Sequence, residues 1–218
     1  IWNIVSLSPD PRMVTATITM LHNIINLMKP ADLLYFCMKL HDLPIASCTS
    51  DILRFLRELT TKLLDRHISV DWSLRGESAR PWNVCVRLLQ DTAPRNGATK
   101  HDSDLNAEVD DQLCFMARSI PEADQRFIYE RCLEQIAARS TKATGSVRVI
   151  FILSTHANST FLQQNGDMVR QIVEELPSFV NTEAKTPQHH YQLPALQHRL
   201  DLLAFLAGRA GQLVPQDL

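Results

Sequence analysis

The feature that most constrains this chain is the way its apolar stretches are interrupted. Pro suits the first position of a helix, because its φ is already fixed and its missing N–H would be unpaired there, and Ser or Thr can cap a helix N-terminus. Gly, which hairpin turns favour, occurs only 6 times in 218 residues. The interruptions therefore predict helix starts rather than hairpin turns. They are Asp10-Pro11, Lys29-Pro30, Thr49-Ser50-Asp51, Arg80-Pro81 and Ile120-Pro121.

Between these interruptions the apolar residues recur with a helical period. After Pro11, the residues Val14, Ile18 and Leu21 follow at spacings of four and three, which places them on one face of a helix. The same pattern predicts helices that begin at Pro30, at Thr49 or Ser50, at Pro81 and at Pro121, and others over 104–119, 167–180 and 193–206. Polar residues, Gly and Pro predict loops over 69–80, 93–103, 140–145 and 181–188.

The stretch 145–164 is ambiguous. Val147, Val149 and Phe151 favour a strand locally. All neighbouring stretches are helical in pattern, however, and none offers a partner strand. We therefore expect a buried helix here.

The spacing of the helix starts suggests a repeat. Starts near 11, 50, 81, 122 and 166 lie roughly 30 to 45 residues apart, which overlaps the period of HEAT and armadillo arrays, roughly 40–47 residues. The sequence thus predicts an all-α fold of antiparallel helix pairs stacked as an armadillo/HEAT-like superhelical array, with residues 1–218 as a single helical-repeat segment. A non-repetitive helical bundle is the alternative. Because the chain opens on Ile1 and has an apolar helix near its end, we expect it to be a fragment of a longer chain.

Composition excludes several classes of function. The net charge is −2 with both signs interspersed, which argues against a nucleic-acid partner. No apolar run approaches the roughly 18 residues that span a bilayer, so we expect no membrane partner. Five scattered cysteines suggest neither a disulfide framework nor a zinc site. A reducing intracellular compartment, cytoplasmic or nuclear, is the expected location.

Motifs for catalysis or for cofactors are not evident. Cys85 and the eight histidines could supply a Cys/His nucleophilic pair, but a free Cys within an apolar helical pattern is typical of a core. His189, His190 and His198 lack the i, i+4 spacing of a helical zinc motif. No phosphate-binding Gly loop occurs. We expect no catalytic, cofactor-binding or metal-binding residue in this segment.

The sequence contains two acidic pairs that could act as carboxylate dyads, Asp110-Asp111 and Glu174-Glu175. Adjacent positions diverge around a helix, so the two members of a pair do not face each other. The pattern predicts solvated helix faces for both pairs.

The best candidate for a recognition site is the expected loop 69–80. It holds Trp72, Arg75 and Arg80, and Trp and Arg are the residue types that dominate protein-binding hot spots. We predict that these three residues bind a protein partner. The competing interpretation is that Trp72 packs the loop against the helices, since Trp is highly buried on average.

The last expected helix is apolar on more than one side. Its stripe would face another helix, either the next repeat or a partner. The stripe consists of Leu193, Leu196, Leu200, Leu203 and Leu206, with Leu202 and Phe205 widening it.

Residues 50–90, SDILRFLRELTTKLLDRHISVDWSLRGESARPWNVCVRLLQ, resemble the non-catalytic helical-repeat regions of very large ubiquitin-specific proteases. The resemblance implies that the parent chain is a deubiquitinating cysteine protease and that this segment positions substrate, ubiquitin chains or regulators. The Cys and His boxes of the protease domain are not present here, so the resemblance assigns no catalytic residue.

Two functional hypotheses follow. The first is a non-catalytic helical scaffold that mediates protein–protein interaction, in a protein of the ubiquitin pathway. The second is a compact helical enzyme or a GTPase-regulatory domain, in which an exposed Arg75, Arg80 or Arg95 acts as an arginine finger.

Overall fold

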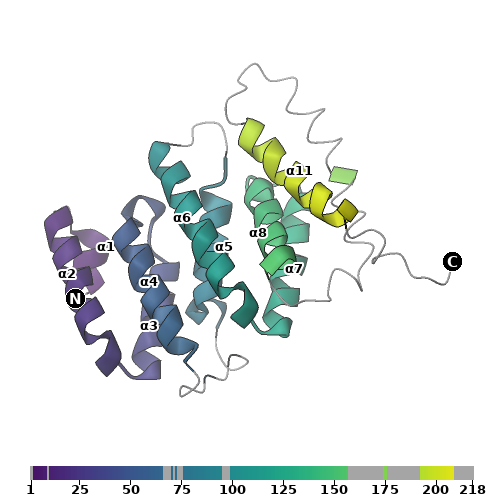
Figure 1. The fold of residues 1–218 in the computed structure, drawn as a ribbon. Coiled ribbons are helices and arrows are strands. Elements are labelled where there is room, and N and C mark those ends of the chain that lie inside the picture. Colours follow the sequence, from purple (N-terminus) through teal and green to yellow (C-terminus); the bar gives the residue numbers. More distant parts are fainter. Residues whose placement is uncertain are drawn as a thin grey trace.

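Every regular element that the computed structural model describes is a helix (Figure 1). The described residues are 2–8, 10–65, 70, 72, 76–94, 99–156, 174–175 and 192–208. The all-α prediction is therefore confirmed, and the ambiguous residues 147–153 lie within a helix. No helix in this part of the chain is both long and apolar enough to span a bilayer.

The α-helices follow one another along the chain, and α1 to α8 form packed pairs. They are α1 (Trp2–Leu7), α2 (Pro11–Ile24), α3 (Pro30–His41), α4 (Ser50–Leu63), α5 (Pro81–Asp91), α6 (Lys100–Met116), α7 (Glu122–Ala137), α8 (Ala143–His156) and α11 (Gln192–Gly208). Short 3₁₀ turns lie between them: η1 (Ile25–Leu27), η2 (Ile45–Ser47), η4 (Glu77–Ala79) and η5 (Ala117–Ser119).

The pairs stack side by side in two layers. Within the pairs, α1 packs on α2, α3 on α4, α5 on α6 and α7 on α8. One layer consists of α2, α4, α6, α8 and α11, each in contact with the next, and Figure 1 shows α1, α3, α5 and α7 behind it. Stacking of this kind buries one face of each helix and leaves an extended outer surface on each layer.

Most helix starts lie where the sequence predicts them, because local capping decides them. At α2, the Asp10 carboxylate accepts the Arg12 N–H at 2.9 Å, and Pro11 occupies the first helical position. α6 begins at Lys100, not at the expected residue 104. Thr99 and Asp102 accept each other's backbone N–H there, at 3.1 and 2.8 Å, and this capping box starts the helix early.

The sequence patterns did not indicate α1, and the expected break over 140–145 is shorter than predicted because α8 already begins at Ala143. Gly145 therefore lies inside α8, where the helix meets the end of α5. A Cβ atom at this position would lie 2.5 Å from the Gln90 Cα, with the Leu89 carbonyl oxygen closer still. Only Gly allows this approach of the two backbones.

α11 is oriented differently from the prediction. Its buried face consists of Ala195, Arg199, Leu202 and Leu206, whereas Leu200 is 44% exposed. This face packs on α8, with Phe205 against Phe151. Arg199 can occupy a buried position because Glu175 supplies its counter-ion at 3.0 Å. A prediction based on the pattern of apolar residues cannot identify a buried arginine of this kind.

The expected helix over 167–180 and the loop 181–188 lie outside the described residues, apart from Glu174 and Glu175, which are helical.

Candidate functional site

Of the predicted recognition residues, the structure places Trp72 and Arg80 against the core. Trp72 is half-buried, and its ring packs edge-on against Trp82 with 4.8 Å between the centroids. The Arg80 guanidinium donates to the Trp72 carbonyl at 3.0 Å and forms an ion pair with Asp124 of α7. Arg75 lies outside the described residues, as does Arg95. The structure thus brings Trp72 and Arg80 together, and both make contacts within the chain.

The ion pair between Arg80 and Asp124 is nearly closed to solvent, with side-chain exposures of 13% and 9%. Burial raises the pKa of Asp124, while the charge and hydrogen bond of Arg80 act in the opposite direction. A buried carboxylate of this kind needs its cation to stay in place. The ion pair therefore connects α7 to the N-terminus of α5.

Burial dominates the chemistry of the five cysteines. It raises the pKa of Cys37 and of Cys132 to about 12, that of Cys48 and of Cys114 to about 11, and that of Cys85 further. A nucleophilic Cys requires the opposite shift, towards the thiolate. The thiols are therefore held in the neutral form.

Acidic residues on and near α6, α8 and α11 form ion pairs rather than a metal site. Within the described residues, no group of three or more His, Cys, Asp or Glu side chains is placed to hold a metal ion. Asp110 accepts Arg148 of α8 at 2.8 Å, and Glu175 accepts Arg199. The prediction that these two acidic residues lie on solvated faces is therefore wrong, because each compensates a partly buried arginine. His189 and His190 lie outside the described residues.

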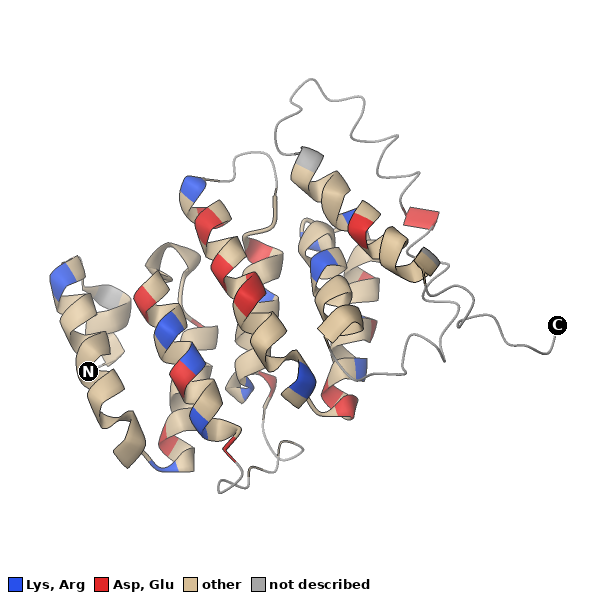
Figure 2. Ribbon diagram, in the orientation of Figure 1, with Lys and Arg blue, Asp and Glu red and all other residues tan. Residues whose placement is uncertain are grey.

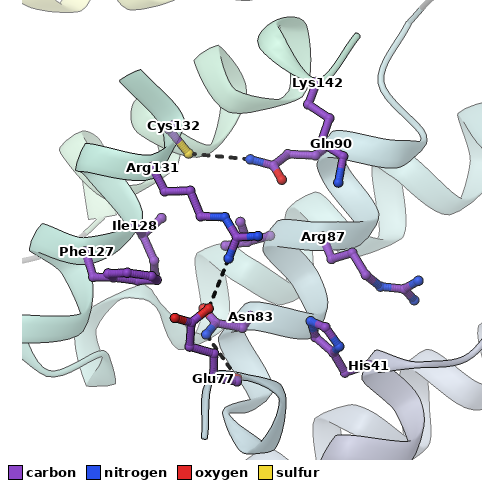
Figure 3. A pocket seen from close by; sticks show the side chains of 11 residues that line it. His41, Glu77, Asn83, Arg87, Gln90, Phe127, Ile128, Arg131, Cys132 and Lys142 are labelled. Atoms are coloured by element: carbon purple, nitrogen blue, oxygen red, sulfur yellow. Dashed lines mark hydrogen bonds and ion pairs between the residues drawn. The ribbon is translucent and has the colours of Figure 1, made fainter. Parts of the chain in front are cut away.

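One concave feature among the described helices is a groove between α5 and α7 (Figure 3). Both helices pack against α8, and the groove of about 140 Å³ lies between them. α5 contributes four residues at i, i+3, i+4 and i+7, which share one helix face. The lining residues are His41, Glu77, Asn83, Val86, Arg87, Gln90, Phe127, Ile128, Arg131, Cys132 and Lys142. We call this the α5–α7 groove.

The floor of the α5–α7 groove is apolar and closely packed. Val86, Ile128 and Cys132 are 7%, 3% and 0% exposed. Gln90 lies beside them and is held by a hydrogen bond of 2.9 Å from its Nε2 to the Ser146 hydroxyl. Phe127 stands at the edge with 37% of its surface exposed. The apolar pattern predicts an inward-facing Phe127, but here α7 borders an opening rather than another helix.

The rim of the groove is charged. Arg131 of α7 reaches across to Glu77 of η4 at 3.0 Å, and Lys142 lies 3.4 Å from Asp91. Arg87 donates from Nη2 to the Leu43 carbonyl at 2.9 Å, and its Nε is buried without a hydrogen-bond partner. Within the described part of the chain, Arg87 has no carboxylate at ion-pair distance.

Sequence reasoning missed this groove. Its charged members are scattered from His41 to Lys142 and follow no local spacing. The only hint in the sequence is Phe127, a large apolar residue next to Ile128 on a helix that also carries many charged residues.

Comparisons with known proteins add no relative: no family model, curated protein or solved structure matches this chain.

Proposed function

We propose that this segment is a non-catalytic helical scaffold that binds a segment of another protein in the α5–α7 groove. One observation carries the proposal: a buried apolar floor is surrounded by half-exposed cationic and aromatic side chains. This is the anatomy of a protein interface, with an apolar centre and a polar rim in which Arg and aromatic residues are enriched.

The architecture supports the same proposal. Helix pairs stacked in two layers resemble an armadillo/HEAT-like array, the finer arrangement that we propose here. Such arrays offer long surfaces on which an extended segment can lie. The raised thiol pKa values favour a binding role over cysteine chemistry.

We further propose that the partner belongs to the ubiquitin pathway, and that the segment works inside the cell as part of a very large ubiquitin-specific protease. The support is the resemblance of residues 50–90, which include α4 and nearly all of α5. α5 supplies one wall of the groove. Five unpaired cysteines are consistent with a reducing compartment.

The alternative, an enzyme or a GTPase regulator with an exposed arginine finger, finds no favourable observation. Arg80 is the one candidate finger within the described residues, and its guanidinium is engaged with Asp124 and the Trp72 carbonyl.

A peptide selection tests the proposal. A random displayed peptide library is selected on the purified protein, and the enriched peptides are measured on two variants, Phe127→Ala and Phe115→Ala. Both side chains are exposed, at 37% and 43%, but Phe127 lies at the groove and Phe115 lies on α6 in the other layer. We expect Phe127→Ala to weaken binding at least tenfold and Phe115→Ala to leave it unchanged, with similar melting temperatures.

Two results would overturn the proposal. One is a selection that enriches no peptide above an inert control protein. The other is a set of peptides whose binding is unaffected by Phe127→Ala, or is lost in Phe115→Ala.

A further inference from the structure

The α5–α7 groove carries an excess of positive charge. Arg87, Arg131 and Lys142 line it together with a single carboxylate, Glu77 (Figure 3). The exposed helix α6 in the other layer differs: Figure 2 shows it rich in acidic residues. The excess is thus a property of the groove, since the whole chain has a net charge of −2.

Arg87 differs from the other arginines that are at least half-buried in the described part of the chain. Arg80, Arg148 and Arg199 each have a carboxylate partner, from Asp124, Asp110 and Glu175. Arg87 instead lies against two uncharged groups, the Leu43 carbonyl and the Cys48 thiol, and its Nε has no hydrogen-bond partner. A partly desolvated cation without a counter-ion is unfavourable, and an incoming carboxylate would supply what the chain does not.

The remaining rim charges can also be released to a ligand. Arg131 and Glu77 are 53% and 48% exposed, and exposed pairs of this kind contribute little to stability. A ligand carboxylate can therefore replace Glu77 at Arg131 at small cost. Lys142 and Asp91 are 39% and 22% exposed and 3.4 Å apart, so Lys142 can also turn towards a ligand.

We infer that the ligand of the α5–α7 groove is an acidic peptide segment, in which one carboxylate binds Arg87 and a neighbouring apolar side chain contacts Val86, Ile128 and Phe127. This inference rests on the proposed function. A peptide fits better than a nucleic acid because the charged rim surrounds an apolar floor, whereas nucleic-acid sites follow a phosphate backbone with an extended basic stripe.

The probe is a fluorescein-labelled peptide, Gly-Glu-Leu-Glu-Glu-Leu-Glu-Gly, blocked at both ends, and its control has Gln in place of every Glu. Binding is followed by fluorescence anisotropy. We expect the acidic peptide to bind at least tenfold more tightly than the Gln peptide, with an affinity that falls as salt rises, because salt screens exposed charges.

Variants then locate the carboxylate. Arg87→Gln should weaken binding of the acidic peptide about tenfold, as expected when one partner of a desolvated charge pair is removed, and Arg87→Lys should have an intermediate effect because Lys lacks the guanidinium fork. Lys142→Gln should weaken binding less and serves as a second variant should Arg87→Gln fail to fold. Arg57→Gln, an exposed arginine on α4 that lies over Phe115, is the matched control and should have no effect.

Several results would overturn the inference: equal binding of the Gln peptide, unchanged binding by a folded Arg87→Gln variant, or an equal loss in Arg57→Gln.

Displacement of the peptide by a ten-residue oligothymidylate, dependent on Arg87, would identify a general polyanion site instead. If library-selected peptides without acidic residues bind the groove, the proposed function stands and this inference fails. If no peptide depends on Phe127, both fail.

Discussion

Arg80 and Arg87 show how two similar residues acquire different roles. Arg80 directly precedes α5 and Arg87 follows seven residues later, about two helical turns along. α7 meets the first arginine with Asp124 and closes over it. Beside the second, α7 presents Phe127, Ile128 and Arg131, and a groove remains. The presence or absence of a counter-ion, and not the residue type, separates a structural arginine from one available for binding.

The largest difference between the two arginines should appear in stability. Replacing Arg80 with Ala leaves Asp124 buried and unpaired, which should lower the free energy of unfolding by about 3–5 kcal/mol. The Arg87→Ala variant loses contacts with the Leu43 carbonyl and the Cys48 thiol but leaves no buried charge unpaired, so it should lower it by only about 1 kcal/mol. Urea denaturation measures both. Equal losses for the two variants would show that Arg80 and Arg87 do not differ in their structural role.

Trp72 should show the next largest effect, because it connects the Arg80 region to the core. Its half-buried ring packs on Trp82, so Trp72→Ala should lower the free energy of unfolding by about 2 kcal/mol, from lost burial and ring packing. Binding of peptides in the α5–α7 groove should not change. If Trp72 were instead a hot spot for a partner, binding would weaken by about 2 kcal/mol at an unchanged melting temperature.

A smaller effect is expected from His198 on α11, which lies near the Arg148–Asp110 pair. Burial, helped by Arg148, lowers the pKa of His198 to about 4, although Asp110 and Asp201 act in the opposite direction. The unfolded chain takes up this proton near pH 6.5 and the folded chain does not, so stability should fall as the pH drops from 6.5 towards 4.

For His198, the fall should be about 1 kcal/mol between pH 7 and 5.5, as measured by urea denaturation at each pH. The variant His198→Gln should remove this part of the pH dependence. An identical pH profile in the variant would show that other groups cause the loss.

The smallest expected effect on stability is that of Glu77→Gln. Its ion pair with Arg131 is half-exposed, so the free energy of unfolding should change by less than about 0.5 kcal/mol. Affinity for the acidic peptide should rise about twofold to threefold, because Arg131 loses its competing carboxylate. A weaker affinity in this variant would show that Glu77 itself contacts the ligand.

The helices could be predicted from the sequence where a local signal decides them. Pro11, Pro30 and Pro81 stand at the first positions of α2, α3 and α5. Residues 147–153 were resolved correctly by the helical context. The early start of α6 could also have been predicted from the sequence, since Thr99 and Asp102 have the spacing of a capping box.

The groove could not be predicted, because tertiary packing alone creates it. His41 lies on α3, Arg87 on α5 and Lys142 in the turn between α7 and α8, and nothing in their spacing relates them. The same limit applies to Arg199, whose inner position depends on Glu175, 24 residues away. Charge pairs between distant residues leave no periodic pattern in the sequence.

The most direct test of the claim that the α5–α7 groove is the binding surface is a methyl NMR titration with the acidic peptide. Val86 and Ile128 report on the groove floor, and Val109 of α6 and Ile18 of α2 report on the other layer. We predict saturable shifts of the Val86 and Ile128 methyl signals, with Val109 and Ile18 unchanged. Shifts confined to Val109 or Ile18, or the absence of any saturable shift, would contradict the claim.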